Sequence, residues 1–168
     1  MLLPFNFKKW IEDNRKDLKP PVGNKKVFED GDFMITVVGG PNSRKDYHDD
    51  PGDEFFYQIE GNMVLRVMEQ GKPRDIPINE GDMFLLPPHV LHSPQRRANT
   101  VGIVIERKRR ADERDGFLWF CDKCHAKLHE EYFALKDIVK DLPPAFDRFW
   151  NNDAARTCKS CGHVMPLP

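Results

Sequence analysis

The chain lacks any long hydrophobic run: no stretch approaches the roughly 18 apolar residues that a membrane-spanning helix requires. Its first residues, M-L-L-P-F-N-F-K-K-W-I-E-D, also lack the basic start, the long apolar centre and the small-residue cleavage site of a signal peptide. We therefore expect a cytoplasmic protein that has no membrane partner.

The chain also lacks an excess of charge of either sign, since 26 Lys and Arg residues balance 27 Asp and Glu residues. We find no internal repeat and no helix-turn-helix pattern. The one basic block, residues 107–110, is interpreted as a solvated strand end or loop. These absences disfavour a nucleic-acid partner.

Cysteine is scarce, but its spacing is informative. The four cysteines form two C-x₂-C pairs, Cys121 with Cys124 and Cys158 with Cys161. In a reducing compartment such pairs bind metal more often than they form disulfides. Together the pairs would complete a closed four-thiolate site with a structural role, in which iron and zinc fit equally well. A zinc ribbon that binds nucleic acid is the functional alternative, and the balanced charge argues against it.

Three histidines, His125, His129 and His163, lie close to these cysteines in the sequence and could serve as alternate ligands. Because four cysteines suffice for a tetrahedral site, we interpret these histidines as surface or packing residues.

At 168 residues and 19.6 kDa, the chain can form one domain with a proper core and a small appendage. Asn6 is expected to cap a short helix, which ends before P-P-V-G-N at residues 20–24. Short strands separated by turn signals then predict an all-β sandwich or barrel. The candidate strands are residues 27–28, 33–38, 54–60, 63–69, 74–78, 83–86 and 100–107.

The character of the sequence changes after residue 110. Residues 112–116 are polar and are interpreted as a linker, followed by one helix around residues 135–140 and another that Pro143 and Pro144 begin, near residues 145–150. We therefore expect a barrel domain at residues 1–110 and a small metal-binding α/β extension at residues 111–168.

Two stretches of the barrel region carry the candidate chemistry: residues 44–61 contain His48 and Glu54, and residues 81–96 contain His92. Two imidazoles and one carboxylate can hold Fe(II) and leave positions open for a chelating substrate and O₂. Asp50 remains open as a fourth ligand, although a hydrogen bond to a ligand or to the turn is the favoured role.

Both stretches resemble the two motifs of the cupin, or jelly-roll, β-barrel. In the first motif Gly40 precedes His48, and six residues separate Glu54 from Gly61. Asp50 replaces the second histidine of that motif, and this replacement leaves three protein ligands rather than four. In the second motif the pattern is met by Gly81, Pro87 and His92, whereas His89 replaces a glycine and Arg96 an asparagine.

Further polar residues flank the predicted metal site. Arg44 lies four residues before His48 and Arg96 four residues after His92, which suggests a clamp on an anion. Glu106 lies on the same strand face as Gly102 and Val104, and a carboxylate beside apolar residues is expected to be paired or functional. Strand alternation predicts that Phe56 and Gln58 point to the same side as Glu54. The alternation leaves open whether Phe56 belongs to the pocket or to the core.

Several segments together resemble the 3-hydroxyanthranilate 3,4-dioxygenase family. They are P-P-V-G-N at 20–24, T-V-V-G-G-P-N at 36–42, Y-H-D-D-P at 47–51, D-E-F-F-Y-Q at 53–58, E-G-D-M-F-L-L-P-P-H-V-L-H-S-P-Q-R at 80–96 and V-I-E-R at 104–107. The resemblance covers nearly the whole chain, including the cysteine tail, where it implies a rubredoxin-like iron.

The resemblance implies an Fe(II)-dependent enzyme that opens the ring of 3-hydroxyanthranilate with O₂, in tryptophan breakdown toward quinolinate and NAD. It implies Fe(II) at His48, Glu54 and His92 and a catalytic role for Glu106. The expected substrate contacts are Arg44, Arg96, Glu106 and Glu54, and Asn24 and Asp46 are expected to be supporting residues.

Two other functions would use the same residues. A cupin dioxygenase for a different aromatic acid would use the same arginine clamp, and a metal-dependent ligand sensor would use the cysteine tail as its contact module. The sensor would need a DNA-reading element, which the sequence does not show. Because exposed apolar strands of cupin barrels often pair, we expect a homodimer.

Overall fold

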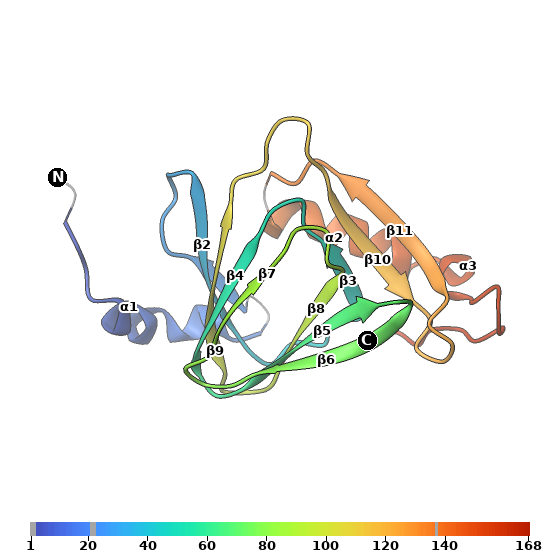
Figure 1. Cartoon of the computed structure of the whole chain (residues 1–168), viewed down its shortest axis with the longest axis horizontal. Coiled ribbons are helices and arrows are strands. Elements are labelled where there is room, and N and C mark those ends of the chain that lie inside the picture. The colour runs from blue at the N-terminus through green and yellow to red at the C-terminus, as the bar shows by residue number, and fades with distance from the viewer. Residues whose placement is uncertain (1–2, 21–22, 137) are drawn as a thin grey trace.

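Two antiparallel β-sheets face each other in the computed structural model, which describes residues 3–20, 23–136 and 138–168. One sheet has the strand order β1-β2-β9-β4-β7 and the other β11-β10-β3-β8-β5-β6 (Figure 1). The strands are β1 (Asn24–Lys26), β2 (Phe33–Gly39), β3 (Asp46–Asp49), β4 (Glu54–Glu60), β5 (Met63–Glu69), β6 (Lys72–Ile78), β7 (Met83–Leu86), β8 (His92–Arg96), β9 (Val101–Arg107), β10 (Asp115–Phe120) and β11 (Lys127–Phe133). The predicted all-β barrel class is confirmed.

Alternating side chains fill the space between the sheets. Strand β5 buries every second residue, Met63, Leu65 and Val67, and β4 does the same with Phe56. Because successive side chains of a strand point to opposite faces, the buried set defines the interior of the barrel. Strand alternation alone does not decide whether Phe56 lies in the pocket or in the core. In the structure Phe56 belongs to the hydrophobic core and does not line the cavity.

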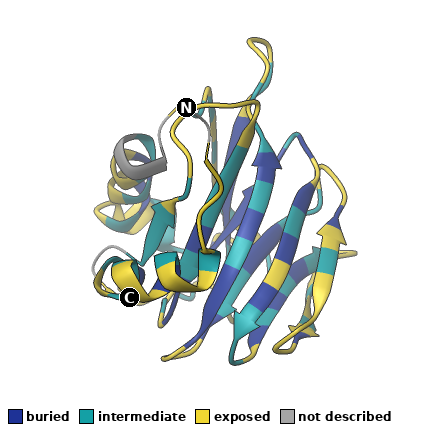
Figure 2. Cartoon of the chain, turned by 90° about the vertical axis from the view of Figure 1, so that its left-hand side faces the viewer, coloured by how far each residue is buried: buried dark blue, intermediate teal, exposed yellow. Residues whose placement is uncertain are grey.

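The N-terminal helix forms as predicted. Helix α1 (Phe7–Asn14) begins after Asn6, whose side-chain oxygen accepts a 2.9 Å hydrogen bond from the Lys9 backbone N–H. A short 3₁₀ helix, η1 (Arg15–Leu18), follows. Ile11 and Leu18 pack on Val37 of the first sheet, so the helix covers one end of that sheet's outer face (Figure 2). The predicted break at residues 20–24 includes Pro21 and Val22, which lie outside the described residues.

The residues after the barrel motifs extend the second sheet. Strand β10 pairs with β3, so that Phe117 lies opposite His48, and β11 pairs with β10. The expected linker at residues 112–116 is therefore wrong at its end, because Asp115 and Gly116 belong to β10. The polar composition of residues 112–116 gives no sign of this strand, because its first residue, Asp115, is polar yet fully buried. The division at residue 110 stays a prediction.

The C-terminal helices pack on the β10–β11 hairpin (Figure 1). The sequence predicts that Pro143 and Pro144 begin a second helix, and this is wrong, because both prolines lie inside the single helix α2 (Ile138–Trp150). Each proline lacks the backbone N–H that would donate a helix hydrogen bond. The apolar face of α2 nevertheless packs on Trp119 and the neighbouring core residues, and this packing stabilises the helix. A short helix, α3 (Asp153–Arg156), follows. Asp137, part of the expected helix at 135–140, lies outside the described residues.

The first predicted strand is misplaced, because β1 lies at Asn24–Lys26 rather than at residues 27–28. Strands β3, β8, β10 and β11 were not predicted. Their sequences D-Y-H-D, H-S-P-Q-R, D-G-F-L-W-F and K-L-H-E-E-Y-F carry no clean polar–apolar alternation, which is the signal on which strand prediction depends. Among the described helices, none is long and apolar enough to cross a membrane.

Candidate functional site

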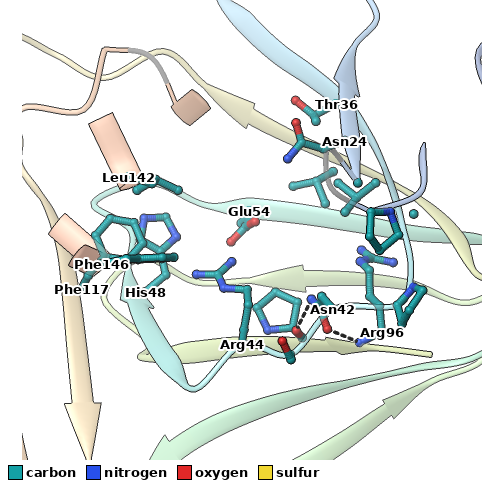
Figure 3. Close-up of a pocket in the computed structure, with 18 of the residues that line it drawn as sticks. Asn24, Thr36, Asn42, Arg44, His48, Glu54, Arg96, Phe117, Leu142 and Phe146 are labelled. Carbon is teal, nitrogen blue, oxygen red and sulfur yellow. Dashed lines mark hydrogen bonds between the residues drawn. The ribbon is translucent and has the colours of Figure 1, made fainter. Parts of the chain in front are cut away.

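Two histidines and one glutamate meet inside the barrel. His48 on β3 and His92 on β8 are direct cross-strand partners in one sheet, and Glu54 begins β4 in the opposite sheet. One ligand atom from each residue lies within 4.8 Å of the other two, and all three side chains are buried. The structure therefore brings the three predicted metal ligands together, and Figure 3 shows His48 and Glu54 at the cavity.

His92 and Glu54 contact each other through His92 Nε2 and Glu54 Oε2. His92 Nδ1–H donates a 2.9 Å hydrogen bond to the Val90 carbonyl oxygen, while His92 Nε2 lies 2.7 Å from Glu54 Oε2. Glu54 Oε2 is nevertheless buried without an aligned hydrogen-bond partner among the described residues. Although burial opposes ionisation, the His92 charge lowers the pKa of Glu54 to about 2. This donor pair requires a cation, either a proton or a metal ion.

Asp115, which the sequence analysis missed, binds the imidazole ring of His48. His48 Nε2–H donates a 2.8 Å hydrogen bond to Asp115 Oδ1, and Phe117 stacks on its ring with centroids 4.8 Å apart. A carboxylate on one imidazole nitrogen fixes the ring and leaves the other nitrogen for a metal. The one available signal was position, because Asp115 directly precedes the apolar run F-L-W-F.

Arg96 lines the cavity and carries a buried donor that has no partner among the described residues. Its Nη1 donates to Gln58 Oε1 at 3.1 Å, but its Nε is buried and has no partner among the described residues. Burial lowers the pKa of Arg96 to about 10. Asn42 fixes the strand beside it by accepting from the Arg96 backbone N–H and donating to the Pro94 carbonyl oxygen (Figure 3). Sequence reasoning had not selected Asn42.

Arg44 lines the same cavity and is paired with Asp46. Burial disfavours the charge on Arg44, but Asp46 outweighs that effect and raises the pKa of the guanidinium. Asp46 therefore lies beside a cavity-lining arginine, and its supporting role stays a prediction. Asn24, the other expected supporting residue, also lines the cavity.

Glu106 lies opposite Glu54 in the pairing of β9 with β4, and it faces the cavity. Burial and the nearby Glu54 charge raise the pKa of Glu106. Its Oε2 accepts a 2.6 Å hydrogen bond from Arg109. The interpretation of residues 107–110 as a solvated block is therefore wrong for Arg109, whose side chain is buried against carboxylates. A basic run gives no sign of which member turns inward.

Asp50 is held by two partners. Its Oδ1 accepts a 2.7 Å hydrogen bond from the Gly52 backbone N–H, and its Oδ2 accepts one of 2.8 Å from Arg109. This is the turn-stabilising role favoured for Asp50. Ligand atoms of Asp50, His48 and Asp115, one from each residue, also lie within 4.8 Å of one another, so these three residues form a second group of potential metal donors.

The cavity has a volume of about 490 Å³. Its walls come from both parts of the chain: the barrel supplies the polar groups, and the C-terminal part supplies the apolar Phe117, Leu135, Leu142 and Phe146 (Figure 3). The arrangement can hold a cation on one side, an anion at the arginines and a flat apolar group between them.

The four cysteines form a second cluster. Cys121 Sγ lies 3.7 Å from Cys161 Sγ, and Cys124 Sγ lies 3.5 Å from Cys158 Sγ. All four sulfurs lie within 4.8 Å of one another, as tetrahedral metal coordination requires. His125 and Gly162, each directly after the second cysteine of a pair, have a φ of 62° and 72°. Their N–H groups donate to the carbonyl oxygens of Cys121 and Cys158, and these bonds close two matching turns.

Two facing antiparallel sheets that enclose two histidines and a glutamate define a cupin barrel with a metal-type donor set. A family model described as 3-hydroxyanthranilic acid dioxygenase matches residues 1–150. The chain belongs to the 3-hydroxyanthranilic acid dioxygenase family.

Known relatives match over the full length of the chain. A 3-hydroxyanthranilate 3,4-dioxygenase from Xanthomonas euvesicatoria pv. vesicatoria is 55% identical over 168 residues, which are 100% of this chain and 95% of the relative. The protein of the same name from Ruegeria pomeroyi is 54% identical and covers 98% of this chain and 92% of its own length. The crystal structure of protein NMB1881 from Neisseria meningitidis superposes with a TM-score of 0.51 at 19% identity, covering 62% of this chain and 99% of that one; it supports the fold alone.

Proposed function

We propose that this protein is an Fe(II)-dependent ring-cleaving dioxygenase that converts 3-hydroxyanthranilate and O₂ to 2-amino-3-carboxymuconate semialdehyde. One observation carries the proposal. Glu54 Oε2 and Arg96 Nε are both buried without an aligned hydrogen-bond partner among the described residues, and both residues line one cavity. The first atom calls for a cation and the second for an anion, and iron together with an aromatic carboxylate substrate supplies both.

In this proposal His48, Glu54 and His92 hold the iron. Two imidazoles and a carboxylate are a donor set suited to ferrous iron with open positions. When bound, the iron supplies a common centre at which the substrate ring and O₂ exchange electrons. Asp115 holds His48 and the Val90 carbonyl holds His92, so both rings keep their orientation before metal arrives.

Arg96 and Arg44 bind the substrate carboxylate. A guanidinium matches a carboxylate in a fixed plane, so the clamp sets which ring bond lies at the metal. Arg96 is pre-oriented by Gln58, and Arg44 by Asp46. Because the reacting bond is chosen by orientation, the clamp contributes to regiochemistry as well as to affinity.

Glu106 accepts the proton that the substrate hydroxyl releases on binding. Its raised pKa makes it a stronger base than a free glutamate, and its place on the cavity wall puts the carboxylate within reach of the substrate. Glu54, although a metal ligand, also lines the substrate cavity. Phe117, Leu142 and Phe146 cover the apolar face of the ring and exclude water from it.

The cysteine cluster holds iron or zinc in a structural role, because four thiolates fill a tetrahedral metal. Reduced cysteines fit a cytoplasmic location. Residues 1–110 supply all three iron ligands, and residues 111–168 carry the cysteine cluster and the apolar wall. The product of ring opening would serve quinolinate and NAD synthesis in tryptophan breakdown.

The protein is further proposed to act as a homodimer through the outer face of the first sheet. That face carries two adjacent rows of apolar side chains in register: Ile35, Ile105, Phe55 and Leu85 in one row, and Ile103, Tyr57 and Met83 in the other. The second row ends at Val37, which α1 and η1 cover. Met83 is 71% exposed and Leu85 is 59% exposed, although both are apolar. These rows contain no charged residue that would select a different partner, so a second copy related by a two-fold axis fits the face.

The experiment is anaerobic loading with Fe(II), followed by 3-hydroxyanthranilate and air. We expect one O₂ to be consumed for each semialdehyde formed, because both oxygen atoms enter the product. Glu54→Ala should lose the barrel iron and the activity but keep the metal of the cysteine cluster, as metal analysis would show. Turnover of a different aromatic carboxylate in place of 3-hydroxyanthranilate would correct the substrate, and no turnover of any aminophenol or catechol carboxylate would refute the enzyme.

A further inference from the structure

Arg109 is the buried cation at the centre of an acidic cluster behind the candidate active site. Its Nη2 lies 2.8 Å from Asp50 Oδ2, 2.6 Å from Glu106 Oε2 and 2.7 Å from Asp115 Oδ1, so that its two N–H groups are shared among three carboxylate oxygens. Its Nε lies 2.9 Å from both oxygens of Asp115, and its Nη1 donates to the Arg107 carbonyl oxygen at 3.1 Å. One side chain thus satisfies three carboxylates and one carbonyl.

The three carboxylates belong to different segments and serve different parts of the site. Asp115, the first residue of β10, accepts the hydrogen bond from His48 Nε2–H. Glu106, on β9, lines the cavity where the substrate would bind. Asp50 closes the turn between β3 and β4. The His48 side and the Glu106 side of the site therefore share one anchor.

We propose that Arg109 is a positioning residue that fixes the ring of His48, through Asp115, and the carboxylate of Glu106 at a set distance from each other. This rests on the proposed function for its catalytic consequence, but the effect on metal binding does not require turnover. A shift of the guanidinium would move the metal-binding ring and the proton-accepting carboxylate together.

The guanidinium shape is essential to this role. A lysine would neutralise the cluster equally well, but it has a single ammonium group and cannot engage both oxygens of Asp115 while it donates to Glu106 and the Arg107 carbonyl. Arg109→Lys therefore separates the geometric role from simple charge neutralisation.

The first test measures Co(II) binding to protein that already holds zinc at the cysteine cluster. We expect Arg109→Lys to weaken Co(II) binding at the barrel site about 10- to 100-fold, the usual effect of losing a group that orients a metal ligand, and to change the visible Co(II) spectrum. With saturating iron, kcat should fall while the KM for substrate changes little, because the carboxylate clamp is intact. The matched control is Arg107→Lys, since Arg107 forms a two-point ion pair with Glu113 at the same strand end; it should bind Co(II) like the wild type.

The second test asks whether Arg109 acts through Asp115. Asp115→Asn keeps an oxygen that can accept the His48 hydrogen bond but weakens the link to Arg109. If the two residues form one unit, the double variant should lose no more Co(II) affinity than the worse single variant. If Arg109→Lys does not fold, the single variant Asp115→Asn replaces it in the test. We expect Asp115→Asn also to weaken Co(II) binding at the barrel site and to change the visible Co(II) spectrum.

Wild-type Co(II) affinity and an unchanged spectrum in Arg109→Lys or, if that variant does not fold, in Asp115→Asn would overturn the positioning role. So would fully additive losses in the double variant. Failure of the wild type to turn over 3-hydroxyanthranilate would instead overturn the proposed function and leave these binding results standing.

Discussion

Arg96 is a charged residue whose side chain is almost completely buried. The residue is 4% exposed, its Nη1 is held by Gln58, and its Nε lacks a partner among the described residues. An unsatisfied buried donor costs stability unless a ligand pairs with it, so this atom marks where an anion is expected. The same reasoning distinguishes Arg96 from Arg44, which already has Asp46 as its partner.

We predict that Arg96→Ala weakens substrate binding about 10- to 100-fold, the value of a charge-assisted hydrogen bond of roughly 1.5–3 kcal/mol. Titration with 3-hydroxyanthranilate under anaerobic conditions measures this affinity directly. Iron content should be unchanged, and Arg96→Lys should recover part of the affinity because it keeps the charge without the planar fork. An unaltered dissociation constant in Arg96→Ala would remove Arg96 from the carboxylate site.

At the scale of the elements, β10 and α2 complete a cavity that the barrel leaves open. Phe117 of β10 stacks on His48, and Phe146 of α2 packs edge-on against Phe117 with centroids 5.7 Å apart. Trp119 and Phe149 stack at 4.5 Å and hold the helix on the hairpin. The C-terminal elements therefore shape the substrate site as well as carrying the cysteine cluster.

We predict that Phe146→Ala raises the substrate dissociation constant about 2- to 10-fold, because an aromatic contact contributes roughly 0.5–1.5 kcal/mol beyond its buried area. The matched control is Trp150→Ala on the same helix, which packs against Phe149 and does not line the cavity. Both variants should lower the melting temperature. Only Phe146→Ala should weaken binding, and equal binding losses in the two variants would show that the effect comes from general loosening of the helix.

At the scale of the whole molecule, the first sheet has an interior face that supplies Glu54 and Glu106 to the site and an outer face that is largely uncovered. Helix α1 covers only the end of the outer face near Val37 (Figure 2). Exposed strands with apolar side chains favour association, so this face decides the oligomeric state in our proposal.

We predict that the wild type sediments at twice the chain mass of 19.6 kDa and that Met83→Glu shifts it toward the single-chain mass. Met83 lies on β7, the edge strand of this sheet, and a charge placed there would be buried unpaired within the apolar interface. Leu167→Glu is the control, since Leu167 is also exposed, at 61%, but lies outside this sheet. A monomeric wild type, or a Met83→Glu variant that remains dimeric, would contradict the proposed interface.

Much of the fold was predictable because its signals are local. The alternation in β4, β5 and β9 and the turn residues between the strands gave the barrel class, and Asn6 gave the start of α1. Strands β3 and β8 were missed because their inward side chains are His48, His92 and Arg96, so the functional residues themselves erase the polar–apolar alternation.

The sequence by itself determined which residues could form the two metal sites. The spacing of His48, Glu54 and His92 within two motifs and the two C-x₂-C pairs needed no coordinates, and the structure brings each set together; their roles as ligands stay predictions. Only the tertiary structure decided what holds these residues in place. Asp115 lies 67 residues from His48 and Arg109 lies 59 residues from Asp50 along the chain, and both contacts arise where β10 and the segment before it pack against β3 and the following turn. Such contacts depend on pairing between distant segments, for which no local pattern exists.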